Sequence, residues 1–481
     1  MTLQRLFRLS ATRLRGGLLA AASALLPALT PAFAQNTTEP LVDILDVPGS
    51  AGLGGVMQVS PSPYRDAGNR YDLLPLYLYE GERLFLQSNR AGIKLLGSAP
   101  GKTGALSEHR FDLFVEQRLE GFPIDKLPAS LAGMDSRGSS VDLGLSYRWQ
   151  QPWGNLEAAL LHDMSNVNKG TEARLGYSYD WRSGRLMLRP SLQVSMRDAR
   201  LNNYYFGVRP GEALASRPAY EPGAGTHTTL GLYGTYDLSQ RWRLLGGVSA
   251  TYLSRQVQAS PIVDRRMVPA VYLGAAYDFG GHKREWAEDG SPTYFKALYG
   301  KSTEDGCHLA KIITAQCLST ASVNPTYISG IQVGKPFIQN LNGWPLDFVG
   351  YVGLTHHDER GLQSNGLQVD VFMKAIYSGF PWSGRVKTRL GLGVGLSAAQ
   401  RAPYIEATSQ AAGGKTASRL LNFLDPTIDV SVGDLIGVRS LKDTYLGFGV
   451  SHRSGIFGSS RLLGNVNGGS NYIYTYLETA L

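Results

Sequence analysis

Three side chains near the end of the chain have the types and the spacing that ester hydrolysis needs. His452 and Ser454 stand two residues apart, and Asn471 follows a stretch rich in Gly and Asn. A serine esterase uses a histidine to activate the hydroxyl and a third group to hold the imidazole in the right tautomer. We interpret His452 as the base, Ser454 as the nucleophile and Asn471 as the orienting group, with no cofactor and no metal. The alternative is a polar cuff of His452, Arg453 and Ser454 where a strand leaves a membrane.

The residues before this pair predict the element that positions it. Leu446, Phe448 and Val450 alternate with glycine and serine, which is the period-2 pattern of a strand with one apolar face. His452 and Ser454 continue the apolar parity. In an outer-membrane barrel that parity faces lipid, so the pair would meet the outer leaflet.

The start of the chain has the pattern of a secretory signal. Four arginines lie within its first 15 residues, Leu18–Leu29 is apolar, and Ala32–Ala34 is an A-x-A cleavage site. We therefore predict a signal peptide over residues 1–34 and an irregular periplasmic segment over 35–55. No later run of ~18 apolar residues suggests a spanning helix.

The rest of the chain predicts an all-β fold. It is rich in Gly (57) and Tyr (25), and strands with apolar residues on one face and Gly or charge on the other recur. That pattern is typical of transmembrane antiparallel β-barrels in a Gram-negative outer membrane, and we count about 12 strands followed by about 8. We predict a first barrel over 56–279 that ends on an aromatic residue, a charged linker over 280–291, and a second barrel over 292–481. The alternative is one barrel of about twenty strands.

In the second set, long and short connections alternate, which predicts long outer loops and short periplasmic turns. The long connections include 301–326, 399–426 and 455–470. Cys307 and Cys317, the chain's two cysteines, lie in the first of these. An oxidising envelope makes a disulfide between them the expected outcome, and no Cys/His spacing suggests zinc.

The net charge of +8 is compatible with two interpretations. Basic residues suit a surface rich in lipopolysaccharide, and they equally suit a solvated lumen and loops. No pattern typical of nucleic-acid binding occurs.

Residues 55–279 resemble the MipA/OmpV family of outer-membrane proteins. The resemblance is carried by YDLLPLYLYEGERLFLQ at 71–87, HDMSNVNKGTEARLGYSYDW at 162–181 and NNYYFGV at 202–208. It implies an outer-membrane scaffold or envelope-integrity protein, because the family includes a scaffold that links a murein-cleaving transglycosylase to a murein synthase. Periplasmic murein enzymes are then the implied partners. The family also includes porin-like and adhesin-like members, and a porin needs an open lumen.

The second set of strands resembles PagL-like lipid A deacylases more distantly. The shared features are His-x-Ser at the outer end of the penultimate strand, a Gly/Asn-rich loop and a last strand. The resemblance implies that His452 and Ser454 belong to a catalytic triad that faces the outer leaflet. The family has an acid just before the last strand, where this sequence has Asn471. The alternative function is therefore an outer-leaflet serine esterase acting on lipid A, with membrane lipid and lipopolysaccharide as partners.

Overall fold

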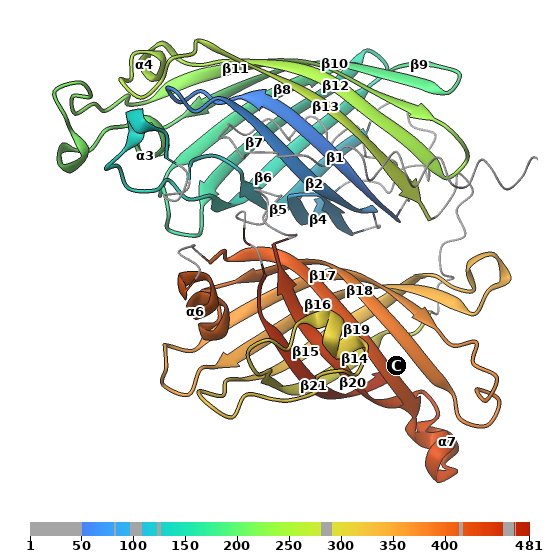
Figure 1. Ribbon diagram of the computed structural model, residues 1–481. Helices are drawn as coiled ribbons and strands as arrows, with labels where there is room; N and C mark the ends of the chain where they lie inside the picture. Colours follow the sequence, from blue (N-terminus) through green and yellow to red (C-terminus); the bar gives the residue numbers. More distant parts are fainter. Residues whose placement is uncertain are drawn as a thin grey trace, which may run out of the picture.

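The computed structural model is an all-β protein with two barrels side by side (Figure 1). It describes residues 51–80, 83–96, 108–122, 127–279, 291–412, 417–455, 466 and 468–481. The predicted signal peptide and nearly all of the predicted linker lie outside these residues. Within the described ranges, no helix is long and apolar enough to cross a membrane.

The first barrel is a ring of antiparallel strands that closes where β13 pairs with β1. Its thirteen strands occupy twelve places, because the short β9 continues the line of β8 beside β10. The first strand starts at Ala51, earlier than the expected residue 56. The strands are β1 (Ala51–Pro61), β2 (Asn69–Glu80), β3 (Leu84–Gln87), β4 (Arg90–Leu96), β5 (Glu108–Arg118), β6 (Ser140–Gln151), β7 (Gly154–Asp163), β8 (Thr171–Ser178), β9 (Trp181–Ser183), β10 (Leu186–Arg197), β11 (Gly225–Asp237), β12 (Trp242–Tyr252) and β13 (Met267–Asp278).

The second barrel is a separate closed ring in which β21 pairs with β14. The prediction of two barrels is confirmed, and the single large barrel is wrong, because each ring closes on itself. The strands are β14 (Tyr294–Ser302), β15 (Tyr327–Ile338), β16 (Leu346–Asp358), β17 (Gly366–Tyr377), β18 (Thr388–Ala399), β19 (Leu420–Ser431), β20 (Thr444–Ser454) and β21 (Asn471–Ala480).

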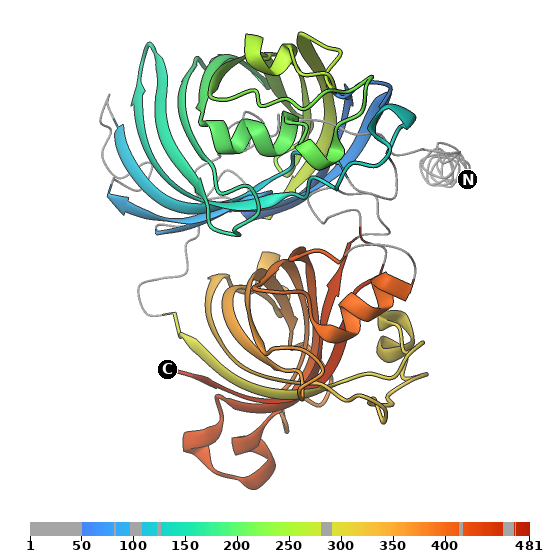
Figure 2. The same cartoon turned by 90° about the vertical axis from the view of Figure 1, so that its left-hand side faces the viewer.

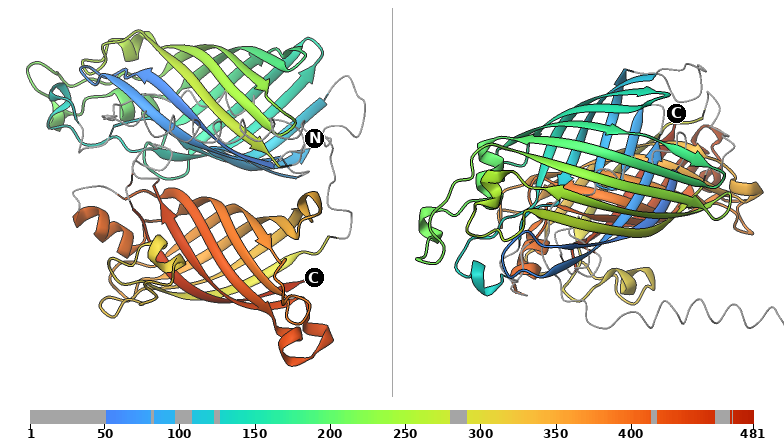
Figure 3. Two further views of the ribbon diagram at one scale, coloured as in Figure 1. Left: turned by 45° about the vertical axis from the view of Figure 1, so that its right-hand side comes forward. Right: turned by 90° about the horizontal axis from the view of Figure 1, so that it is seen from above.

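Short helices lie in the connections of both barrels. The α-helices are α3 (Ala199–Phe206), α4 (Arg255–Gln258), α5 (Leu309–Ile313), α6 (Tyr404–Ala412) and α7 (Val432–Ile436). The 3-10 helices are η2 (Ala129–Leu131), η3 (Pro210–Glu212), η4 (Leu341–Gly343) and η5 (Arg439–Leu441). Helices α3, α4 and α6 lie at one end of the molecule and α7 lies at the other (Figures 1 and 3).

Both barrels have the same orientation across the membrane. Each begins and ends its ring at the end that carries α7, as the pairs Gly52–Asp278 and Tyr294–Ala480 show. The long connections, such as 198–224 and 303–326, lie at the opposite end. Long extracellular loops and short periplasmic turns are typical of outer-membrane barrels, so the α7 end is periplasmic. The connection 432–443 is longer than expected because it contains α7 and η5.

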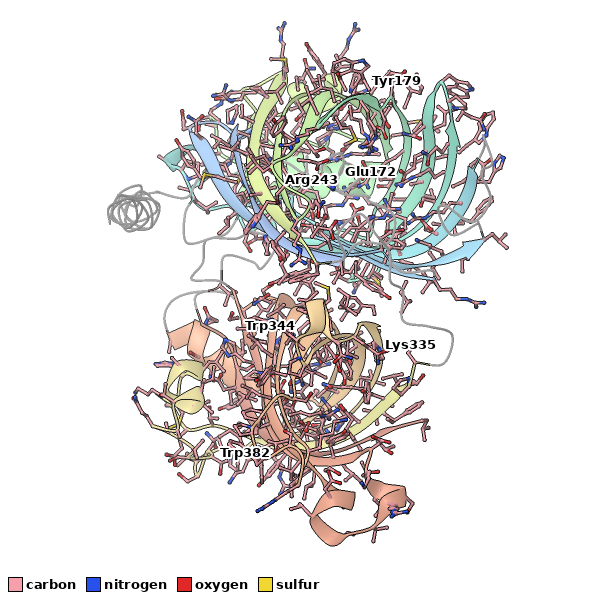
Figure 4. All side chains as sticks on the ribbon, turned by 90° about the vertical axis from the view of Figure 1, so that its right-hand side faces the viewer. Glu172, Tyr179, Arg243, Lys335, Trp344 and Trp382 are labelled. Atoms are coloured by element: carbon pink, nitrogen blue, oxygen red, sulfur yellow. A yellow bond between two sulfur atoms is a disulfide. The ribbon has the colours of Figure 1, made fainter. Side chains whose placement is uncertain are left out.

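Exposed tryptophans form a belt at the periplasmic end, where indole rings favour the membrane interface. Trp344 and Trp382 lie at the rim of the second barrel (Figure 4) and are 68% and 55% exposed. Trp153, Trp181 and Trp242 of the first barrel are exposed in the same way, each next to a turn at that end. The belt therefore supports the same membrane placement for both rings.

The strand faces follow the predicted parity. Leu390 and Leu392 of β18 are about half exposed on the outer face, whereas Gly391 and Gly393 face the lumen. The lumen of the second barrel is crowded at this position. A side chain at Gly391 would come within 2.6 Å of the Lys374 side chain. A larger residue at Gly391 would therefore require the side chains of Lys374 and Thr427 to shift.

The lumen of the first barrel is lined by paired charges on one side and by apolar side chains on the other. Glu172 lies inside the ring (Figure 4) and pairs with Arg118, Arg174 and Arg197. The apolar wall consists of Val56, Leu76, Leu78, Met187, Tyr233, Leu245, Ala270, Tyr272 and Ala276. The charges that line this lumen are thus neutralised in pairs.

The outer mouth of the first barrel is closed by its own small hydrophobic core, which we call the outer cap. It is built from residues 62–68, 119–122, 127–139, 198–224 and 253–266, and its centre contains Tyr64, Phe122, Leu131, Tyr205, Phe206 and Val257. Figure 2 shows these segments across the mouth of the ring. Arg137 fastens the cap by donating to both carboxylate oxygens of Glu212, at 2.8 and 2.6 Å.

The wall of the first barrel is incomplete on its outer half. β2 pairs with β1 along its length, but it pairs with β3 only at Leu78, Tyr79 and Glu80. The hairpin β3–β4 turns at Ser88, so the outer half of β2 has no strand partner on that side among the described residues. Pro75 lies in this half and lacks the amide hydrogen that a continuing ladder needs. We call the gap between β2 and β5, on the outer side of the turn at Ser88, the notch.

The second barrel covers the notch. Leu74, Tyr77, Leu86 and Leu119 of the first barrel form one buried cluster with Leu396, Leu420, Leu421 and Val466 of the second. Nearer the periplasm, Ala51 packs with Phe337, Phe348 and Met373. Tyr77, Leu396 and Leu420, which strand parity would place against lipid in a single barrel, are thus buried between two barrels.

Candidate functional site

Strands β20 and β21 bring His452 and Asn471 together across one ladder position. The imidazole Nδ1 lies 2.7 Å from the Oδ1 of Asn471. The Nδ2 of Asn471 donates to the carbonyl of Cys307 at 3.3 Å, which orients the amide with its oxygen toward the histidine. Nδ1 of His452 is then the protonated nitrogen, and Nε2 carries the lone pair that a general base uses.

Ser454 lies on the same face of β20 but is not hydrogen-bonded to His452 among the described residues. Positions i and i+2 of a strand are ~7 Å apart, so the hydroxyl reaches Nε2 only if the side chains lean together. Opposite Ser454, on β19, is Asn422. The structure therefore brings His452 and Asn471 into contact. Ser454, the candidate nucleophile, lies on the same face of the strand but does not contact the imidazole through a hydrogen bond among the described residues.

Arg453 points the other way, into the lumen, which is why it does not belong to a polar cuff. It is 1% exposed and donates to Glu406 Oε2 at 3.1 Å and to Ser397 Oγ at 2.8 Å. The pair Arg453–Glu406 thereby fastens α6 in the outer mouth of the second barrel. Burial raises the pKa of the Glu406 carboxyl, and the Arg453 guanidinium opposes that rise. Strand parity predicts that Arg453 and His452 lie on opposite faces of β20. Parity does not predict the partner of Arg453, Glu406, which lies far away in the sequence.

The cysteines of the first outer loop form a disulfide, with their Cα atoms 5.7 Å apart. The bridge closes a short segment that contains α5. Because Cys307 also accepts the hydrogen bond from Asn471, this loop lies directly against the candidate site. The disulfide is thus part of the structure that orients Asn471.

Two carboxylates of the second barrel, Glu478 and Asp425, are paired with basic side chains in the lumen. Glu478 is in the lumen, where it accepts from Arg389 at 2.7 Å and pairs with Lys296 at 3.2 Å. Asp425 was expected in the outer loop, but it lies in β19 and accepts from Lys374 at 2.7 Å. The loop prediction was wrong because β19 begins at Leu420. Neither carboxylate replaces Asn471.

The described part of the chain gathers no three His, Cys, Asp or Glu side chains that could hold a metal ion. The outer end of β20 offers an imidazole, an amide and a hydroxyl from His452, Asn471 and Ser454.

Comparison with known proteins finds relatives of the first barrel. Residues 53–279 match the family model described as MltA-interacting protein MipA. The chain is 35% identical over 150 residues to outer membrane protein Omp26La of Vibrio anguillarum and to outer membrane protein OmpV of Vibrio cholerae. These matches cover 31% of this chain and 58% of each relative, so the chain spans little more than half the length of the Vibrio proteins. It is 25% identical over 232 residues to the MltA-interacting protein of Escherichia coli, which is 48% of this chain and 91% of that protein.

Two closed antiparallel rings with apolar outer faces, and relatives that are named outer membrane proteins, define an outer-membrane β-barrel protein. Its first barrel belongs to the MipA/OmpV family, as the motifs at 71–87, 162–181 and 202–208 indicated. The matched residues end at 279, before the second barrel begins at Tyr294.

Proposed function

We propose that this protein is an outer-membrane scaffold that holds periplasmic murein enzymes at the membrane. The observation that carries the proposal is the match of the first barrel to the MltA-interacting protein over 91% of that protein's length. The outer cap across the mouth of the first barrel favours a scaffold over a porin, because a porin needs an open passage.

The periplasmic end of the second barrel offers a surface suited to this role. The connection 432–443 projects from the ring at α7 (Figure 1), and Leu435, Ile436 and Val438 are 56%, 60% and 40% exposed there. Adjacent exposed apolar side chains on a projection are typical of a protein-binding site. Arg439 and Lys442 flank them and add positive charge.

The test is capture of a purified murein transglycosylase by the full chain in detergent. We expect capture by the wild type and at least tenfold weaker capture by Leu435→Ser/Ile436→Ser. The matched control is Ile313→Ser/Leu318→Ser, two exposed apolar residues of the outer disulfide loop, which should leave capture unchanged. Failure of the wild type to capture the enzyme would contradict the scaffold, and equal loss in both variants would contradict the docking surface.

The second candidate function is an outer-leaflet esterase, and the 2.7 Å contact between His452 and Asn471 favours it. Ser454 Oγ would attack the carbonyl carbon of a lipid ester and pass its proton to His452 Nε2. The imidazolium would return that proton to the leaving sugar oxygen, and water would then hydrolyse the acyl-serine and release the fatty acid. The step requires the Ser454 side chain to rotate toward the imidazole.

A further inference from the structure

One row of side chains crosses the outer end of the second barrel on its lipid-facing side. Lys301 of β14 lies opposite Tyr327 of β15 on one side and opposite Ile473 of β21 on the other. Lys301 continues the outward parity of Phe295 and Tyr299, which are 44% and 57% exposed. β14 and β21 lie on the side of the second barrel away from the first (Figures 1 and 2), so this row faces lipid.

Two cationic side chains lie beside the same aromatic ring in this row. The Nζ of Lys301 lies 6.0 Å from the centre of the Tyr327 ring. The guanidinium carbon of Arg360, in the connection between β16 and β17, lies 5.8 Å from the centre of that ring. The Tyr299 ring stacks on Tyr327, with the ring centres 6.0 Å apart. The aromatic pair thus gathers a lysine and an arginine at the outer boundary of the membrane.

These two cations have weak anionic partners in the protein. Lys301 forms no ion pair within the described part of the chain, and the acids of the adjoining loop, Glu304 and Asp305, lie beyond the end of β14. Arg360 pairs with Asp358 at 3.8 Å, but their side chains are 61% and 42% exposed, and such surface pairs contribute little. Arg360 can therefore pair with a second anion. An ammonium and a guanidinium are the side-chain groups that bind phosphate oxygens in proteins.

The position of these cations selects the source of the phosphate. They lie at the outer end of the barrel, so the headgroups beside them belong to the outer leaflet, which carries phosphorylated glycolipid in a Gram-negative outer membrane. Below them, the outward side chains of β14 and β15 are apolar and exposed, as Phe295, Ile331 and Val333 show, and acyl chains can lie on this surface. We propose that Lys301 and Arg360 bind a phosphate group of an outer-leaflet glycolipid.

This phosphate site lies beside the candidate hydrolytic residues. Asn471 and His452 lie on β21 and β20, the two strands that follow β14 around the ring. The amide of Thr303, two residues after Lys301, donates to the carbonyl of Asn471 at 3.1 Å. A glycolipid bound by its phosphate would thus have its sugar near His452. The phosphate site rests on the membrane placement and not on the esterase, so binding is measured separately from hydrolysis.

The test uses the full chain in phospholipid nanodiscs that contain a second component. The first preparation contains diphosphorylated lipid A, and the second contains lipid A from which both phosphates have been removed. Native mass spectrometry counts the retained glycolipid. We expect one retained molecule in the first preparation and about tenfold weaker retention in the second, because the charge-assisted contacts are lost. Equal retention in the two preparations, or retention in neither, would overturn the phosphate site.

A third preparation identifies the source of the phosphate. It contains diphosphorylated lipid A together with an excess of inorganic phosphate. We expect the lipid to be retained as in the first preparation, because its acyl chains also contact β14 and β15. Displacement of the lipid by inorganic phosphate would overturn the glycolipid as the source.

Substitutions separate this site from general attraction to a charged lipid. Lys301→Gln/Arg360→Gln removes both charges, so we expect about tenfold weaker retention. The matched control is Arg385→Gln/Lys387→Gln, which removes the same two charges at the periplasmic end, where Lys387 lies 5.7 Å from the centre of the Tyr445 ring. The control should retain lipid A as the wild type does. Both variants are checked for heat-modifiable migration, which reports a folded barrel. Unchanged retention by a folded Lys301→Gln/Arg360→Gln protein, or equal loss in both variants, would overturn the site.

Discussion

The hydroxyl of Tyr77 in the first barrel donates a hydrogen bond to Oδ1 of Asn422 in the second. Both side chains lie on faces that would meet lipid in an isolated barrel. A polar amide at such a position is costly in hydrocarbon unless it is hydrogen-bonded. The pair therefore shows that β2 and β19 are adapted to each other.

Removing this hydroxyl should destabilise the junction. Tyr77→Phe leaves Asn422 Oδ1 buried without a donor, so we expect a loss of about 1–3 kcal/mol in the free energy of unfolding. Urea titration in lipid vesicles measures it. Tyr299→Phe, at a 57% exposed position of β14, is the control and should change little. Adding Asn422→Leu to Tyr77→Phe should restore part of the loss, because no polar group then remains unpaired. If the two tyrosine variants behave alike, the contact does not stabilise the junction.

The isolated first barrel should fold, yet with lower stability than in the full chain. A fragment of residues 35–281 keeps the closing pair β13–β1 but exposes the apolar residues of the notch, such as Leu74 and Leu119. We expect heat-modifiable migration on a gel and a lower urea midpoint. A fragment that never folds would show that the second barrel is required to complete the wall.

The faces of the strands were predictable from the sequence, whereas the junction was not. Period-2 alternation in β18 follows from the different environments of its two faces, so Leu390 and Leu392 could be placed at once. Tyr77 and Tyr79 look like ordinary lipid-facing aromatics, and only the short β3 reveals that their face needs a cover. Asn422 was expected in a loop. Its contact with Tyr77 joins residues far apart in the chain, which no local pattern contains.

A charge on the lipid face of β18 should be costly. Leu392 is 51% exposed near the middle of its strand, so Leu392→Arg should lower the free energy of unfolding by ~2–4 kcal/mol. The same exchange at Leu318, 61% exposed in the outer loop, should cost little because that loop is in water. Equal stability of the two variants in lipid vesicles would contradict the assignment of the membrane face.

The outer cap should loosen in acid. Burial alone would raise the pKa of Glu212, but hydrogen bonds from Arg137 and from backbone amides outweigh it and lower the pKa below its usual value of 4.5. A carboxyl with a lowered folded pKa stabilises the fold above its unfolded pKa, and this contribution is lost as the pH falls through the folded pKa. Hydrogen exchange at 198–224 should therefore accelerate below about pH 4.5. Glu212→Gln should exchange faster at neutral pH and show a weaker acid response; an unchanged response would assign the effect to another group.

The last prediction concerns the residues at the outer end of β20. If the second barrel hydrolyses lipid esters, Ser454→Ala should reduce fatty-acid release by several powers of ten, because the proposed mechanism forms the acyl-enzyme on the Ser454 hydroxyl. Ser451→Ala is the matched control, since Ser451 lies on the opposite face of the same strand and should not affect the rate.

The variant Asn471→Asp tests the orienting role of residue 471 directly. Asn471 already holds the Nδ1 side of His452 at 2.7 Å, so a carboxylate there would keep the tautomer and also stabilise the imidazolium by charge. Activity should stay the same or rise, and a fall in activity would contradict the role of Asn471 as the orienting group. Mass spectrometry of fatty acid released from lipid A by the purified protein measures both variants. If neither the wild type nor Asn471→Asp releases fatty acid, the esterase is excluded, and the hydrogen bond between His452 and Asn471 serves only to fix the disulfide loop against the barrel.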